Sequence, residues 1–129
     1  MSDRTPQEKS AAIVMAGLER KAEKPVALDV ANVTSFCDAF VILTGRSDRQ
    51  VRAIADGIVQ SMKHAGDAPL GVEGVDEARW VLIDCNDVIC HVFIEEARSL
   101  YDLERLWADA TPIKLDLPEA ALEEAGEVA

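Results

Sequence analysis

Two strand-like runs joined by a short turn occupy residues 79–94, whose sequence is RWVLIDCNDVICHVFI. Both runs are largely apolar and rich in Val and Ile, which favour strands. Between them lies the pair Cys85-Asn86, and Asn tolerates the left-handed backbone conformation that a tight turn needs. The stretch therefore predicts an antiparallel hairpin of strands 79–84 and 87–94.

One side of this predicted hairpin mixes an aromatic ring, aliphatic chains, an imidazole and two carboxylates. With a two-residue turn, the facing pairs on that side are Trp80 with His91, Leu82 with Ile89, and Asp84 with Asp87. The other side is apolar and is predicted to be core: Val81, Ile83, Val88, Cys90, Val92 and Ile94. A Trp on an apolar patch rimmed by charge is typical of a protein interface. A core Trp beneath a helix, with two solvated turn carboxylates, fits the same pattern.

Working outward, the sequence predicts a helix over 10–22, strands over 26–30 and 39–43, and a helix after Ser47. Residues 39–43 are continuously apolar, as in a strand buried on both faces. The helix after Ser47 has a capping box with Gln50, apolar residues at helical spacing, and Gly66 as its stop.

A final helix is expected over 95–107, which gives the order α-β-β-α-β-β-α. This order predicts an α/β fold with a single mixed β-sheet and packed helices. Residues 68–74 contain Pro69, Gly71 and Gly74, so we do not expect them to be regular throughout.

The length and the charge of the chain indicate its domain organisation and the kind of partner it could bind. A chain of 129 residues fits one domain, here 1–108, and residues 109–129 carry −5 of the net charge of −11, which predicts an acidic, flexible tail. The acidic balance disfavours direct binding to nucleic acid and favours a basic partner.

The N-terminus lacks the apolar centre of a signal peptide, and no apolar run approaches the length of a membrane span, so a cytoplasmic location is expected.

No residue pattern predicts catalysis, a cofactor or a metal site. The three cysteines lack CxxC spacing, and the neighbours Cys90 and His91 point to opposite faces of a strand. Residues 44–47 precede a capped helix and are too short for a phosphate-binding motif. The alternative is a small nucleotidyltransferase-like enzyme that uses Asp84 or Asp87 with a divalent metal. A generic dimeric interaction module is a third possibility.

Several short blocks together resemble the ribosomal silencing factor family, also called Iojap-like. They are LDV (28–30), DAFVI (38–42), TGRSDRQV (44–51), GVEG (71–74), WVLID (80–84), DVICHVF (87–93) and YDLERLW (101–107). The resemblance spans about residues 10–107, and the order and spacing of the blocks make it specific. It implies a non-enzymatic protein with nucleotidyltransferase-like topology. It also implies binding to ribosomal protein fourteen of the large subunit, which blocks subunit association and represses translation under nutrient limitation. The free protein is then expected to be a homodimer in the cytoplasm.

The partner-binding residues that the resemblance implies lie on the hairpin and the start of the last helix. They are Trp80, Leu82, Asp84, Asp87, Ile89 and His91, with Glu95, Arg98 and Tyr101 as an extension. The chain departs from the family at Cys85-Asn86, where an aromatic residue and Gly are common. It also continues for 22 residues past Trp107, beyond the point where many members stop.

Overall fold

The computed structural model describes residues 4–102, 108–115 and 117, although not the side chain of Tyr101. The elements are α1 (Pro6–Glu19), β1 (Glu23–Asp29), β2 (Ala39–Gly45), α2 (Asp48–His64), β3 (Gly71–Glu73), β4 (Trp80–Asp84), β5 (Val88–Ile94), α3 (Glu95–Tyr101) and β6 (Thr111–Pro112). No helix in these ranges is long and apolar enough to cross a membrane.

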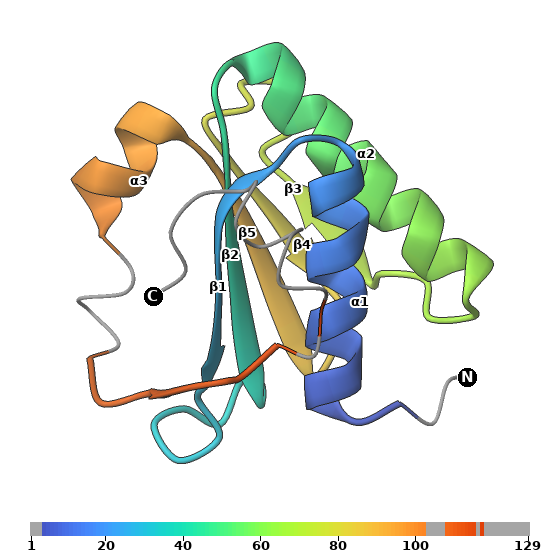
Figure 1. Ribbon diagram of the computed structural model, residues 1–129, viewed down its shortest axis with the longest axis vertical. Coiled ribbons are helices and arrows are strands. Elements are labelled where there is room, and N and C mark those ends of the chain that lie inside the picture. The colour runs from blue at the N-terminus through green and yellow to red at the C-terminus, as the bar shows by residue number, and fades with distance from the viewer. Residues whose placement is uncertain (1–3, 103–107, 116, 118–129) are drawn as a thin grey trace.

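The strands form one mixed sheet in the order β3-β4-β5-β2-β1-β6. Only β2 and β5, the two long apolar runs, pair in parallel among the described strands. Helices α1 and α2 cover one face of the sheet, and α3 lies on the other side (Figure 1). The predicted α/β fold with a single mixed sheet is confirmed. The sequence did not reveal β3 and β6, which are three and two residues long.

Helix α1 begins earlier than the predicted residue 10. Thr5 is its N-cap, and its hydroxyl accepts a hydrogen bond from the backbone N–H of Glu8 at 3.1 Å. The Glu8 carboxylate accepts in return from the Thr5 N–H at 3.0 Å, and Pro6 occupies the first helical turn. The sequence TPQE is therefore the start signal of this helix.

Helix α2 follows its prediction closely. The Ser47 hydroxyl accepts from the Gln50 N–H at 3.1 Å. The Gln50 side chain reaches one residue further back than a capping box requires, to the N–H of Arg46 at 2.7 Å. After the helix, Gly66 has a φ of +80°, which is the left-handed conformation expected of a stop residue.

The predicted register of the β4–β5 hairpin is wrong by two residues. Asp84 faces Ile89, Leu82 faces His91, and Trp80 faces Phe93. The turn is longer than two residues because the Asp87 carbonyl accepts hydrogen bonds from the backbone N–H groups of Asp38 (2.8 Å) and Ala39 (3.1 Å). Asp87 is therefore hydrogen-bonded to the start of β2 and does not pair with β4. Because the shift is even, each strand residue keeps its predicted face.

Helix α3 covers the first seven residues of the helix expected over 95–107. Helix α3 ends at Tyr101, and Asp102 follows with a left-handed φ of +44°. Residues 103–107 lie outside the described residues. Part of the segment expected as a tail belongs to the fold, because β6 pairs with β1 and Leu115 is buried in the core beneath α1 and α2. Residues 118–129 lie outside the described residues.

Candidate protein-interaction surface

Five of the predicted site residues share one face of the hairpin, opposite to α1 and α2. We call this the β4–β5 face: Trp80, Leu82, Asp84, Ile89 and His91. All except the buried His91 are half-buried. The alternating pattern of β4 produces this face, since Val81 and Ile83 point into the core on the helix side.

Trp80 is held in place by a polar contact and by ring packing. Its indole N–H donates a hydrogen bond to Nδ1 of His91 at 3.0 Å. Its ring also lies 5.0 Å, centroid to centroid, from that of Phe93. On the far side of the imidazole, Phe40 makes an edge-to-face contact with His91 at 5.1 Å. The ring of Trp80 is thus pre-oriented, which lowers the entropic cost of using it as an anchor.

His91 is a neutral imidazole in this environment. Only 5% of the residue is exposed, and burial lowers its pKa from 6.5 to about 4. Nδ1 accepts the Trp80 hydrogen bond, so the proton of the neutral ring resides on Nε2. That buried nitrogen has no hydrogen-bond partner within the described structure.

A hollow of about 600 Å³ lies beside Trp80. Its lining residues are Val72, Gly74, Val75, Asp76, Glu77, Arg79 and Trp80. Arg52 of α2 holds this segment, donating to the carbonyls of Val75 at 3.0 Å and Asp76 at 2.5 Å. Asp76 and Glu77 bring two negative charges to the hollow and Arg79 brings one positive charge, and all three residues are exposed. The sequence prediction missed these residues, and the acidic pair shortly before Trp80 was the available signal.

Gly74 allows this segment to lie against β4. Its φ is +86°, and a Cβ there would sit 2.3 Å from the Trp80 carbonyl oxygen. The position therefore requires glycine both for its backbone conformation and for its close approach to the chain.

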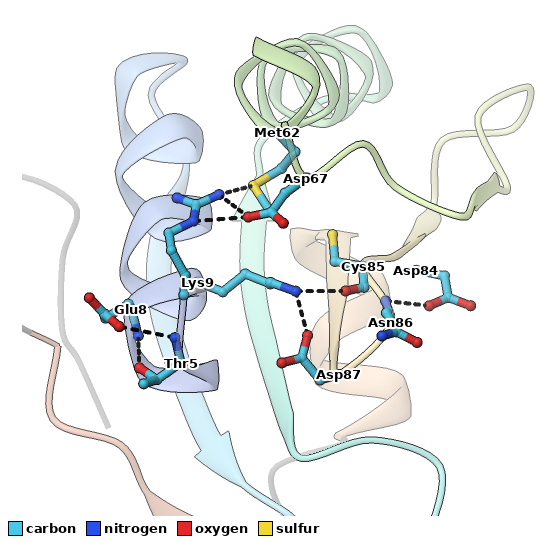
Figure 2. Close-up of polar contacts among 10 residues, drawn as sticks. Thr5, Glu8, Lys9, Met62, Asp67, Asp84, Cys85, Asn86 and Asp87 are labelled. Carbon is cyan, nitrogen blue, oxygen red and sulfur yellow. Dashed lines mark hydrogen bonds and ion pairs between the residues drawn. The ribbon is translucent and has the colours of Figure 1, made fainter. Parts of the chain in front are cut away.

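Asp87 does not face Asp84 as predicted. Its carboxylate accepts from Nζ of Lys9 in α1 at 2.5 Å, and the same ammonium donates to the Cys85 carbonyl at 3.3 Å. Asp84 lies on the other side of the turn, where its carboxylate accepts from the Asn86 N–H at 2.9 Å (Figure 2). The two carboxylates therefore have separate partners, which is poor geometry for a shared metal ion.

A second hollow, of about 580 Å³, lies on the helix side of the same turn. Arg4 and Lys9 line it together with Asp67 and Asp87. Arg4 pairs with Asp67 at 2.6 Å and Lys9 pairs with Asp87, so each cation already has an anionic partner. These contacts fasten the hairpin tip to α1 and leave little positive charge for an anionic ligand.

The three residues of the predicted extension on α3 lie in different environments. Glu95 is exposed and pairs with Lys24 at 3.3 Å. Arg98 is buried, and its guanidinium donates to the Thr44 hydroxyl at 2.6 Å and to the Lys24 carbonyl at 2.5 Å. Arg98 thus ties α3 to β1 and β2. Tyr101 ends the helix, and its side chain lies outside the described structure.

We expect Arg98→Met to lower the free energy of unfolding by about 2 kcal/mol, because the buried Thr44 hydroxyl and the partly buried Lys24 carbonyl lose a charged donor. Urea unfolding measures this change. Glu95→Ala is the matched control on the same helix. It should change stability by less than about 0.5 kcal/mol, because its ion pair is exposed. Equal effects of the two variants would contradict a structural role for Arg98.

The nucleophile and metal chemistries considered from the sequence find little support in these residues. Cys37, Cys85 and Cys90 are free and buried, and burial raises the pKa of the first two to about 11. Such thiols are protonated at neutral pH and are weak nucleophiles. Within the described ranges, no group of three or more His, Cys, Asp or Glu side chains could hold a metal ion.

These features define a small α/β protein with an aromatic, acid-rimmed surface suited to a macromolecular partner. A family model described as "Ribosomal silencing factor during starvation" matches residues 3–128. The ribosomal silencing factor of Bacillus subtilis is 45% identical over 98 residues, covering 76% of this chain and 83% of that protein. The chain therefore belongs to the ribosomal silencing factor family.

Two further relatives and one solved structure are also similar to this chain. The ribosomal silencing factor of Chromobacterium violaceum is 36% identical over 106 residues, covering 82% of this chain and 87% of that protein. A crystal structure from the same organism superposes with a TM-score of 0.79 at 32% identity, covering 93% of this chain and 99% of that one. A mouse protein named for mitochondrial assembly of the ribosomal large subunit is 33% identical over 75 residues, which are 56% of this chain and 33% of that protein.

Proposed function

We propose that this chain represses translation under nutrient limitation by binding ribosomal protein fourteen of the large subunit. Bound there, it would block association of the small and large subunits by occupying the surface that they need to meet. The observation that carries the proposal is Trp80, a half-buried, pre-oriented ring beside a hollow lined by two acidic residues, Asp76 and Glu77, and one basic residue, Arg79. A Trp in this setting is a typical binding hot spot, and the rim charge suits a basic partner.

The net charge of the chain supports the same kind of partner. The net charge of −11 favours a basic ribosomal protein over direct contact with RNA. The proposed partner-binding residues remain the β4–β5 face, with Glu95 and Tyr101 as its extension. Asp87 and Arg98 would act by holding this surface in place, because both are engaged inside the molecule. We propose that the mechanism is steric and non-enzymatic, that the protein works in the cytoplasm, and that the free chain is a homodimer.

Sedimentation of purified ribosomal subunits tests the proposal. At a magnesium concentration that permits joining, adding the protein should reduce the fraction of joined particles. The protein itself should travel with the large subunit. If it stays at the top of the gradient and joining is unchanged, the proposal is wrong. Binding to isolated ribosomal protein fourteen then identifies the contact within the large subunit.

A further inference from the structure

Phe36 is the most exposed of the large apolar side chains in the described residues, at 85%. We infer that its ring is a second anchor for the basic ribosomal protein, at the end of the β4–β5 face away from Trp80. This inference rests on the proposed function and extends its contact surface to the loop between β1 and β2. Single exposed apolar residues are common on protein surfaces, so the argument depends on how this ring is held and on what surrounds it.

The loop from residue 30 to residue 38 is closed by its own hydrogen bonds. The Val30 N–H donates to the Asp38 carbonyl at 2.9 Å and joins the two ends of the loop. Inside it, the Val30 carbonyl accepts from the N–H groups of Val33 and Thr34, both at 3.0 Å. The Phe36 N–H donates to the Thr34 hydroxyl at 3.2 Å. The ring is therefore carried on an ordered turn, and little backbone entropy would be lost when a partner covers it.

The next residue fixes the loop against the sheet. Cys37 is buried in the same apolar cluster as Phe40, and Ile89 packs against this cluster. The Asp38 N–H also donates to the Asp87 carbonyl, which joins the loop to the hairpin turn. The loop that carries Phe36 therefore lies at the same end of the sheet as Asp84, the last residue of β4. Trp80 starts that strand, and five residues of strand place the two ends about 13 Å apart.

The charge around the ring favours the same kind of partner as the charge around Trp80. Between Lys24 and Arg46 the chain carries two acidic residues, Asp29 and Asp38, and no Lys or Arg. Burial is the main cause of the raised pKa of Cys37, and the nearby carboxylates of Asp38 and Asp84 add to it. The two proposed aromatic anchors would then stand toward opposite ends of the β4–β5 face, Phe36 on a loop whose charged residues are acidic and Trp80 beside a hollow lined by Asp76, Glu77 and Arg79. This is the arrangement expected for a basic protein surface with apolar contacts.

The test is Phe36→Ala, measured by binding to purified large ribosomal subunits. Affinity should fall about tenfold, the loss expected for an exposed aromatic contact in an interface. The melting temperature should not change, because the ring is exposed. Phe36→Leu should recover part of the affinity. Leu70→Ala is the matched control, since Leu70 is 71% exposed but lines the hollow on the helix side. It should bind like the wild type.

The outcomes separate this inference from the proposed function. If the wild type binds and Phe36→Ala binds equally well, the second anchor is wrong while the ribosomal proposal stands. If both alanine variants lose affinity to the same extent, the effect is not specific to Phe36 and the inference is again overturned. If the wild-type protein does not bind, the proposed function fails and the second anchor fails with it.

Discussion

Trp80→Ala is expected to weaken binding to the large ribosomal subunit about 30-fold or more, the loss that a central aromatic hot spot produces. The ring is half-buried, so part of its surface is available to a partner. The hydrogen bond to His91 and the contact with Phe93 hold it ready for binding. The alanine variant loses both the ring surface that a partner would contact and the two contacts that orient the ring. Equilibrium binding to purified large subunits measures the loss.

Two controls separate lost contact from lost structure. Trp80→Ala removes internal packing as well, so its circular dichroism and melting temperature must first show a folded protein at the temperature of the binding assay. Trp80→Phe keeps an aromatic ring but cannot donate to Nδ1 of His91. It should bind with intermediate affinity. Wild-type affinity in a folded Trp80→Ala variant would rule out the β4–β5 face as the binding surface.

Acidification should destabilise the protein through His91, by about 3 kcal/mol in total and about 2 kcal/mol at pH 5. Burial keeps the imidazole neutral in the folded state, where its pKa is lowered from 6.5 to about 4. Between these two pH values the unfolded chain therefore binds more protons than the folded one. The full stability contribution is present above pH 6.5 and is lost as the pH falls toward 4.

The measurement is the free energy of unfolding in urea at pH 7.5 and pH 5, compared with His91→Gln. Glutamine does not titrate and still offers an oxygen to the Trp80 indole. Carboxylates titrate in both proteins, so their effects cancel in the comparison. The wild type should lose about 2 kcal/mol more than the variant between the two pH values. Equal losses would mean that His91 is not held neutral by burial.

The sequence predicted the parts of this fold that depend on strong local patterns. The apolar run of β2, the amphipathic spacing of α2 with its Ser47 cap, and the two faces of the hairpin all agree with the structure. Each follows from side-chain periodicity, which local sequence records directly.

The features that the sequence did not reveal depend on contacts between distant residues. The hairpin register shifted because Asp87 bonds to the start of β2, and its carboxylate was drawn to Lys9, 78 positions earlier in the chain. Arg98 was predicted to be at the surface, but it is buried against Thr44. The position of Phe36 beside the hairpin also needed the fold. Its loop is ordered by backbone hydrogen bonds, which carry no residue pattern, and by one bond to the Thr34 hydroxyl.

The short outer strands β3 and β6 limit how copies of this molecule can associate. In the part of the chain that the structure describes, each offers only two or three residues for pairing, and Pro112 in β6 has no N–H to donate. Continuous growth of the sheet from one molecule to the next would gain few hydrogen bonds at either edge. The proposed homodimer would therefore use side-chain contacts, and the β4–β5 face carries large rings and aliphatic chains suited to them. The proposed self-association and the proposed ribosome binding would then use one surface, so at a higher protein concentration a larger share of the protein would be dimeric and unable to bind the ribosome.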